Sequence, residues 1–124
     1  MTPAEKQAWL AKCWVTCIPV GFGVLQYTAF HPSYPAPAGV VWVIGYGGKV
    51  PTADVLHSYT LPFFRRKGVR SLINEQLLKD YAVIRTSGGS KEGGAAFLKA
   101  AGYTFDKVRG DWFLKSPKKK ARVR

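Results

Sequence analysis

The chain has 124 residues, which is enough for one folded domain and too few for two domains with separate hydrophobic cores. Hydrophobic residues make up 47% of the sequence and aromatic residues 14%, which excludes a chain that is disordered throughout. The formal net charge is +12, although residues 13–48 contain no Lys, Arg, Asp or Glu. A basic chain of this kind attracts polyanions, so nucleic acid, acidic proteins and phosphorylated cofactors are all open as partners.

The first predicted element is a helix that begins after Thr2. Thr2 can act as its cap, Pro3 suits the first helical position, and Glu5 stands where a capping box needs it. The apolar stripe of this helix continues through Trp9, Leu10, Cys13 and Cys17. Because residues four apart share a helix face, the two cysteines are predicted to be buried, reduced thiols. No second Cys or His pair has zinc-ligand spacing, so no metal site is expected.

The uncharged stretch after this helix is harder to assign. Residues 13–30 are apolar but contain Pro19 and two glycines, which favours a buried element or a partner-binding surface over a membrane span. Residues 24–30 fit either a short helix or a strand. The proline-rich run 31–39 is predicted to be a surface loop, with a polyproline ligand as the alternative. This uncharged third is expected to form an acceptor groove or a homodimer interface.

The second half of the chain has clearer patterns. A single domain is predicted over residues 1–116, followed by a basic tail at 117–124. Its elements, in chain order, are a strand at 40–46, a strand at 54–61, a helix at 69–81, a strand at 82–86, a turn at 87–90, a helix through 95–101 that Gly102 ends, and a hairpin of 103–108 with 111–114. A strand–loop–helix crossover at the centre predicts an α/β fold.

The loop from Arg65 to Ser71 carries the strongest functional signal. It lies between a predicted strand and a predicted helix, whose first N–H groups have no intrahelical partner and carry the positive end of the helix dipole. An anion can bind there, and Gly68 would let the backbone approach it closely. Four cations surround that position: Arg65, Arg66, Lys67 and Arg70. On these residues alone, an anion-binding loop and a solvated basic turn that caps a helix are equally good interpretations.

The loop also resembles a known motif. The run Arg65-Arg66-Lys67-Gly68-Val69-Arg70 is similar to the pyrophosphate-binding motif of the GNAT superfamily of N-acetyltransferases, which reads Arg or Gln, two residues, Gly, one residue, then Gly or Ala. The run from Ala95 to Tyr103 resembles the family's later helix, which ends in Gly followed by an aromatic residue. The resemblance implies a GNAT-like mixed sheet flanked by helices and an acetyl-CoA-dependent N-acetyltransferase that acts on an amine of a protein or small molecule.

The resemblance also implies roles for individual residues. Thr60 and Leu61 would offer backbone hydrogen bonds to the pantetheine arm of acetyl-CoA. The pyrophosphate would be wrapped by Arg65, Arg66, Lys67, Gly68, Val69, Arg70 and Ser71. Three departures stand out. Arg70 replaces Gly or Ala, Leu98 replaces the tyrosine that protonates the leaving thiolate in many members, and Lys91 replaces a common asparagine. The family's usual first strand is not evident in the first 50 residues.

The base that accepts the amine's proton is predicted to be His57, since imidazole titrates near neutral pH. Tyr59, on the same strand face as His57, and Asp54 are weaker candidates, and Tyr103 is a substitute acid. The alternative interpretation is that His57 has a structural role.

Two rivals to the enzyme remain at this point: a catalytically inactive GNAT-like module that binds a protein or nucleic acid through its basic surface, and a structural component of a larger assembly. The tail 117–124 resembles a nuclear-import signal and would also serve as a tether to a polyanion or an acidic protein, or simply as a solvated end. With no recognisable signal peptide, we expect a cytoplasmic protein without a membrane anchor.

Overall fold

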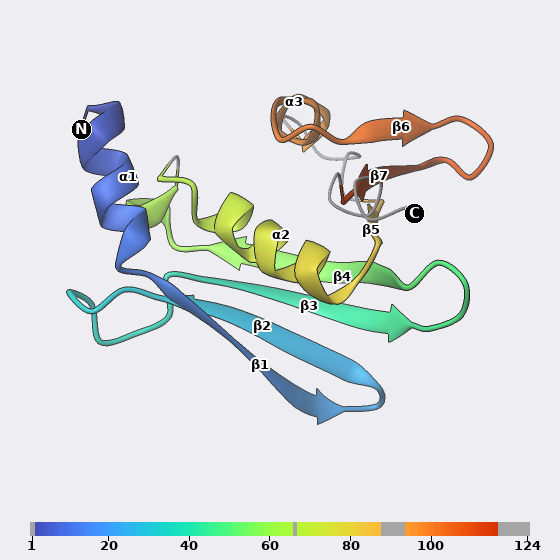
Figure 1. The fold of residues 1–124 in the computed structure, drawn as a ribbon, viewed down its shortest axis with the longest axis horizontal. Helices are drawn as coiled ribbons and strands as arrows, with labels where there is room; N and C mark the ends of the chain where they lie inside the picture. Colours follow the sequence, from blue (N-terminus) through green and yellow to red (C-terminus); the bar gives the residue numbers. More distant parts are fainter. Residues whose placement is uncertain (1, 66, 88–93, 117–124) are drawn as a thin grey trace, which may run out of the picture.

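The computed structural model describes residues 2–65, 67–87 and 94–116, which form a mixed sheet with helices packed against it (Figure 1). The helices are α1 (Pro3–Ala11), the 3-10 helix η1 (Pro62–Phe64), α2 (Val69–Asp80) and α3 (Gly94–Ala100). The strands are β1 (Trp14–Gly21), β2 (Val24–Phe30), β3 (Gly39–Tyr46), β4 (Thr52–Thr60), β5 (Val83–Thr86), β6 (Thr104–Asp106) and β7 (Asp111–Lys115). Arg66, Lys91, most of the predicted turn at 87–90 and the predicted tail lie outside the described residues.

The seven strands form one sheet in the order β1-β2-β3-β4-β5-β7-β6. Successive strands from β1 to β4 are antiparallel, β4 and β5 are parallel, and β5, β7 and β6 are antiparallel again. The parallel pair is joined by α2, as a crossover between parallel strands requires. The predicted single α/β domain with a mixed sheet flanked by helices is confirmed.

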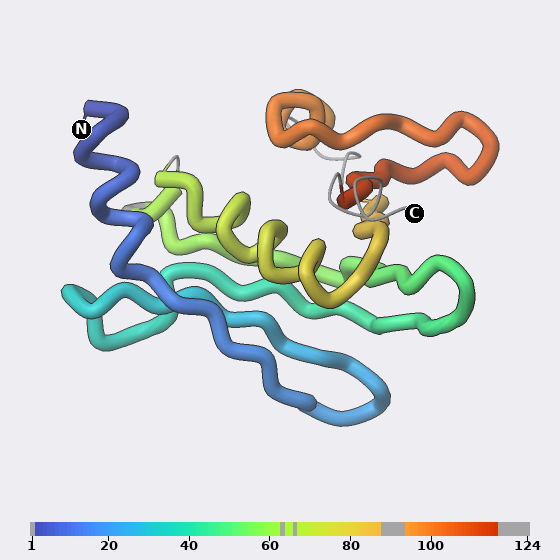
Figure 2. The backbone as a smooth tube through the Cα atoms, viewed as in Figure 1, coloured from blue at the N-terminus to red at the C-terminus, as the bar shows by residue number. Residues whose placement is uncertain are grey.

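The hydrophobic core lies between α2 and the sheet. Figure 2 shows α2 lying against one face of the sheet, over β3 and β4. The helix contributes Val69, Ile73 and Leu77, each at most 1% exposed. The sheet contributes buried residues from its central strands: Tyr27, Ala29, Val41, Val43, Ala53, Val55 and Ile84. This core fixes the position of the start of α2 relative to β4, which matters for the site described below.

The predicted N-terminal helix is confirmed, together with its capping box. The Thr2 side chain accepts a hydrogen bond from the Glu5 N–H, and the Glu5 carboxylate accepts one from the Thr2 N–H. The helix ends at Ala11, however, so the prediction that Cys13 and Cys17 share a helix face is wrong. Both thiols are free, but Cys13 is only half-buried and Cys17 is exposed, which also contradicts the predicted burial.

The stretch 13–30 forms a β-hairpin, so the first strand that the sequence analysis did not detect is present as β1. Its turn consists of Gly21, Phe22 and Gly23, all with φ between +55° and +105°, a left-handed backbone region that glycine tolerates well. The pairing of Val15 with Ala29 and of Cys17 with Tyr27 leaves β1 at the edge of the sheet, which explains the exposure of Cys17. The ambiguous segment 24–30 is therefore a strand.

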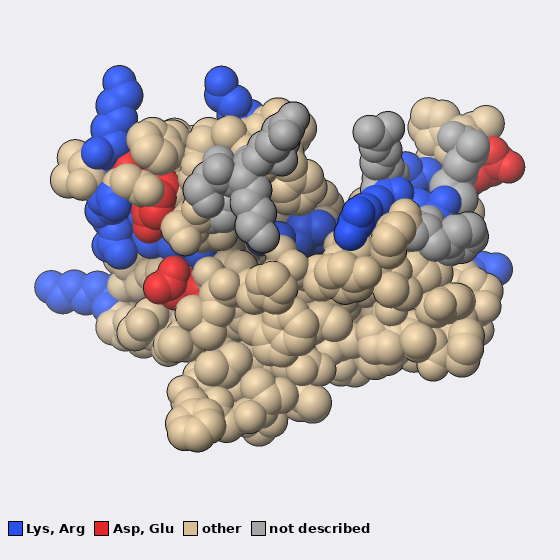
Figure 3. Space-filling model, turned by 180° about the vertical axis from the view of Figure 1, so that it is seen from behind, with Lys and Arg blue, Asp and Glu red and all other residues tan. Residues whose placement is uncertain are grey.

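The back of the sheet is a separate surface. From behind, the broad lower surface shows no acidic or basic side chain, and the basic side chains lie toward its rim (Figure 3). Large apolar side chains of the uncharged stretch are exposed, including Trp14 at 48% and Ile18 at 49%. No helix in the described part of the chain has the length and hydrophobicity needed to cross a membrane.

The C-terminal hairpin follows the prediction closely. Gly102, with φ of +93°, ends α3, and Gly110, with φ of +74°, closes the turn between β6 and β7. Arg85 of β5 ties this hairpin to the sheet through ion pairs of 2.7 Å to Asp111 and 3.3 Å to Asp106. Hydrogen bonds from backbone N–H groups near the turn, together with Arg85, lower the pKa of Asp106.

Candidate active site

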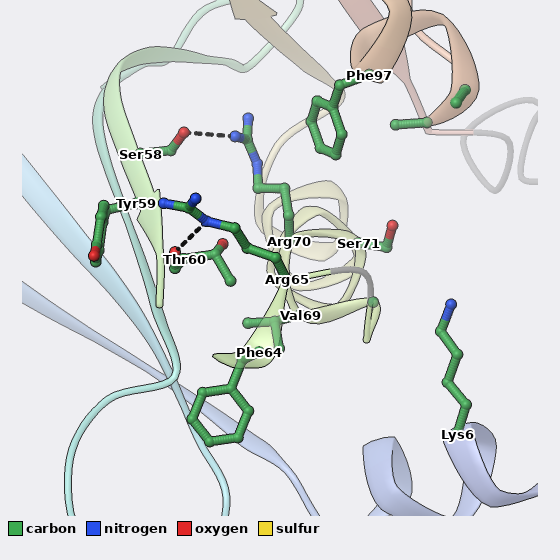
Figure 4. A pocket seen from close by; sticks show the side chains of 13 residues that line it. Lys6, Ser58, Tyr59, Thr60, Phe64, Arg65, Val69, Arg70, Ser71 and Phe97 are labelled. Carbon is green, nitrogen blue, oxygen red and sulfur yellow. Dashed lines mark hydrogen bonds between the residues drawn. The ribbon is translucent and has the colours of Figure 1, made fainter. Parts of the chain in front are cut away.

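The site begins where β4 and β5 separate. The two strands pair only from Thr52 opposite Val83 to Val55 opposite Thr86, whereas β4 continues to Thr60. No described strand pairs with β4 on that side beyond Val55. A cavity of about 480 Å³ opens beside this free edge, between β4, the start of α2 and α3 (Figure 4). It is lined by Lys6, Ser58, Tyr59, Thr60, Phe64, Arg65, Gly68, Val69, Arg70, Ser71, Phe97, Ala100 and Ala101.

The start of α2 presents free N–H groups to this cavity. Gly68 is the residue before the helix and has a left-handed φ of +87°. Its carbonyl accepts a hydrogen bond from the Leu72 N–H, but no side chain caps the helix. Among the described residues, no hydrogen bond uses the N–H groups of Val69, Arg70 or Ser71. Three adjacent N–H groups at the positive end of a helix dipole are suited to bind an anion.

Gly68 also lies close to α1. A Cβ atom at position 68 would lie 2.9 Å from Leu10 Cδ1 and 3.5 Å from Lys6 Cε. Both neighbours belong to α1, more than fifty positions earlier in the sequence. This packing against α1 is separate from the predicted close approach of the Gly68 backbone to an anion, which stays a prediction.

Two arginines of the loop turn back toward β4. The Arg65 Nε donates a 3.0 Å hydrogen bond to the Thr60 carbonyl, and the Arg70 Nη1 donates a 2.8 Å hydrogen bond to the Ser58 hydroxyl (Figure 4). The Arg70 guanidinium also lies 5.9 Å from the centre of the Phe97 ring. Arg70, which departs from the GNAT-like motif, therefore spans the cavity from α2 to β4 and places a positive charge within it.

Arg70 is held by a small buried network. Its Nε donates to Asn74 Oδ1 at 3.2 Å, and the Tyr103 hydroxyl donates to the same oxygen at 3.2 Å. Asn74 and Tyr103 are each 4% exposed. Burial raises the pKa of the Tyr103 phenol. Tyr103 does not line the cavity, so its predicted role as a substitute acid is not favoured by its position.

Two of the backbone groups predicted to pair with the pantetheine arm already have partners. The Thr60 carbonyl accepts from Arg65, and the Leu61 N–H donates to the Ala38 carbonyl at 3.1 Å. Since backbone groups alternate sides along a strand, the N–H and C=O of Ser58 face the same free edge as those of Thr60. A ligand paired with β4 would therefore meet the backbone of Ser58 and would have to displace Arg65 from Thr60.

Of the residues predicted as bases, Tyr59 is among those that line the cavity, whereas His57 and Asp54 are not. Ser58 points toward α2, so its neighbours His57 and Tyr59 lie on the opposite face of the sheet. Both are exposed; His57 stacks on Trp42 with ring centres 5.5 Å apart, and Tyr59 lies 5.7 Å below the Arg65 guanidinium. Asp54 lines a separate cavity of about 330 Å³, away from the start of α2.

Five of the predicted loop residues line the cavity together with Thr60: Arg65, Gly68, Val69, Arg70 and Ser71. Lys67 lies in the loop, and its N–H donates to the Phe64 carbonyl at 3.3 Å. Leu98, where the resemblance would place a tyrosine, is a core residue only 3% exposed. In the described residues, no group of three or more His, Cys, Asp or Glu side chains could hold a metal ion.

Six residues that line the cavity were not predicted as site residues: Lys6, Ser58, Phe64, Phe97, Ala100 and Ala101. Lys6 comes from α1, Ser58 from the free edge of β4 and Phe97 from α3. Ser58 could have been found, because it lies between the two candidate bases on a predicted strand and must point to the other face. Lys6 and Phe97 had no local signal, since only the tertiary fold brings their elements to the loop.

Solved structures of acetyltransferases share this fold. One, from Desulfovibrio desulfuricans and described as an acetyltransferase of the GNAT family, has a TM-score of 0.58 and 15% identity over 76% of this chain and 69% of its own. The ribosomal-protein-S18-alanine N-acetyltransferase of Escherichia coli has a TM-score of 0.52 and 12% identity over 94% of this chain and 90% of its own. AtaTR bound with acetyl-CoA has a TM-score of 0.58 and 10% identity over 80% of this chain and 71% of its own.

The sequence itself matches no protein-family model and no curated protein. The structural likeness confirms the predicted GNAT fold, in a strongly divergent sequence.

Proposed function

We propose that this protein is an acetyl-CoA-dependent N-acetyltransferase. The observation that carries the proposal is the set of N–H groups at Val69, Arg70 and Ser71, which have no hydrogen-bond partner among the described residues. These groups lie at the cavity, beside the part of β4 that no described strand pairs with. One end of the cavity suits an anion and the other offers a strand edge and apolar surface. Acetyl-CoA has the same two parts, a pyrophosphate and an extended pantetheine arm.

The residues present fit this ligand. The N–H groups at the start of α2 would bind the pyrophosphate, and Arg65 would add charge close to it. Phe97 would contact the pantetheine arm, while the backbone of Ser58 would pair with its amides. AtaTR, which has the same fold, binds acetyl-CoA, and this supports the choice of ligand. Binding would exchange the hydrogen bond from Arg65 to Thr60 for contacts with the ligand.

The transfer step uses both faces of the sheet. The acyl donor would lie on the α2 side, so the acceptor amine would approach the thioester from the opposite face, where His57 and Tyr59 are exposed. The amine nitrogen forms a bond to the carbonyl carbon, the carbon–sulfur bond breaks, and the amine's proton passes to the base. His57 is the better base, because imidazole accepts protons near neutral pH. The thiolate takes a proton from solvent, since the buried Leu98 supplies none.

The test is calorimetric titration with acetyl-CoA at low salt, followed by an assay of thiol release with a panel of amines. The Gly68→Trp variant places an indole against α1 and the cavity, so it should abolish binding while circular dichroism shows a folded sheet. Saturable binding and amine-dependent thiol release, both lost in the variant, support the proposal. A folded wild-type protein that binds no acetyl-CoA would refute it.

The second candidate is a binding module with no turnover. Two observations favour it: Arg65 and Arg70 occupy the edge of β4, and the position of the usual acid is the buried Leu98. In that case the same titration would show binding of acetyl-CoA, or of a polyanion alone, without thiol release for any amine.

A further inference from the structure

A second cavity continues the first one beyond Gly68. It has a volume of about 410 Å³ and lies between α1 and α2. It shares three residues with the first cavity: Lys6, Gly68 and Ser71. The two cavities therefore adjoin at the start of α2. The first lies along the free edge of β4, and the second, called the groove below, lies between α1 and α2.

Lys6 stands at the junction of the two cavities. Its side chain extends from α1 toward the start of α2, on the side of Ser71 (Figure 4). None of the ion pairs and hydrogen bonds found among the described residues uses its ammonium group. The neighbouring Glu5 carboxylate is held by the Thr2 N–H, and Glu75 is an exposed residue at the second cavity. The junction therefore has a cation with no ion-pair or hydrogen-bond partner among the residues that the structure describes.

The second cavity has a mixed lining. Leu10 and Leu72 offer apolar side chains from the two helices, and Gln7 and Glu75 offer polar ones. An aromatic heterocycle with exocyclic hydrogen-bond donors fits such a lining, whereas a doubly charged phosphate fits only the end beside Lys6.

We propose that the groove between α1 and α2 receives the nucleotide end of coenzyme A and that Lys6 binds its 3′-phosphate. This inference rests on the proposed function. With the pyrophosphate on the N–H groups of α2, the next parts of the ligand are a phosphorylated ribose and an adenine. The shared junction supplies the cation for the phosphate, and the leucines of the second cavity supply the surface for the base. The chain thereby distinguishes coenzyme A from its 3′-dephospho form.

The expected discrimination follows from the position of Lys6. A charge-assisted contact at a partly exposed site changes affinity by about three- to tenfold. The wild-type protein should therefore bind coenzyme A about three- to tenfold more tightly than 3′-dephospho-coenzyme A at low salt. The difference should shrink as salt is raised, because the pair is near the surface.

The experiment is a four-way calorimetric comparison of the wild-type protein and Lys6→Ala, each titrated with coenzyme A and with 3′-dephospho-coenzyme A. Lys12→Ala is the matched control, because Lys12 is an exposed lysine just after α1 and lines neither cavity. Lys6→Ala should lower the affinity for coenzyme A to that for 3′-dephospho-coenzyme A, and it should leave the affinity for 3′-dephospho-coenzyme A unchanged. Lys12→Ala should keep the full preference.

Other outcomes separate the two claims. If Lys6→Ala keeps the preference for coenzyme A, or weakens both ligands equally, Lys6 does not bind the 3′-phosphate and the inference is wrong while the proposed function stands. If the wild-type protein binds neither ligand, the proposed function fails and the inference fails with it.

Discussion

Replacing Gly68 with alanine tests the loop, because a single methyl group acts on the fold and on the site at once. Gly68 has a φ of +87°, and a left-handed backbone costs a residue with a Cβ about 1–2 kcal/mol. The new Cβ would also lie 2.9 Å from Leu10 Cδ1, and moving that side chain off its rotamer costs about 0.5–1.5 kcal/mol. Together these terms predict that Gly68→Ala lowers the free energy of unfolding by about 2–3 kcal/mol.

The matched control is Gly110→Ala. Gly110 has a similar φ of +74°, but nothing lies within 4 Å of its Cβ position, so only the backbone cost applies. An unfolding entropy of about 2.1 cal/mol/K per residue means that 1 kcal/mol lowers the Tm of a chain this size by about 4 °C. We expect a loss of about 8–12 °C for Gly68→Ala and about 4–8 °C for Gly110→Ala.

The binding assay then separates stability from function. Calorimetry with acetyl-CoA, well below both melting temperatures, should show at least tenfold weaker binding for Gly68→Ala and unchanged binding for Gly110→Ala. Equal binding by both variants would show that the loop around Gly68 does not approach the ligand, and the reasoning from its backbone would then be refuted.

Three further substitutions test neighbouring parts of the site. Ser58→Ala removes the acceptor of the 2.8 Å hydrogen bond from Arg70. Urea denaturation should show that the free energy of unfolding falls by about 1 kcal/mol. Since only the backbone of Ser58 is proposed to contact the ligand, a loss of acetyl-CoA binding would contradict that proposal. His57→Gln should lower kcat by about 10²-fold or more without changing the affinity for acetyl-CoA, measured by thiol release and calorimetry; an unchanged kcat would exclude His57 as the base. Tyr103→Phe removes a group whose pKa is raised by burial, so the folded state holds this proton more tightly than the unfolded state. The stability it contributes is complete below the ordinary tyrosine pKa of about 10 and is lost as the pH rises above it. The variant should therefore lose less stability between pH 9 and 11 than the wild-type protein in denaturation curves, and identical alkaline slopes would count against this account.

Much of the second half of the fold could be predicted because its signals are local. The β-branched run of β3, the helical spacing of α2 and the positive-φ glycines at 102 and 110 each determine an element from neighbouring residues. The prediction for the first third of the chain was wrong for an equally local reason. Cys13 and Cys17 are spaced as on a helix, and that spacing masked a two-residue alternation and the turn at Gly21-Phe22-Gly23.

Only the part of the site that is formed by consecutive residues could be predicted from the sequence. The loop from Arg65 to Ser71 could be recognised, because a strand, a basic turn and a helix follow one another there. The direction of Arg70 could not, since its partners Ser58 and Asn74 come from a strand and a later helical turn. Lys6 was out of reach as well, because its place beside Gly68 depends on how α1 packs against the loop.

The most direct test of the account is whether the amides that begin α2 respond to the ligand. Acetyl-CoA, and in parallel inorganic pyrophosphate, would be titrated into ¹⁵N-labelled protein while amide chemical shifts are followed by NMR. If these amides hold the pyrophosphate, both ligands should cause saturable shifts of the Val69, Arg70 and Ser71 amides, and acetyl-CoA alone should cause further shifts along β4. Binding of acetyl-CoA that leaves these three amides unmoved would contradict the claim that they hold its pyrophosphate.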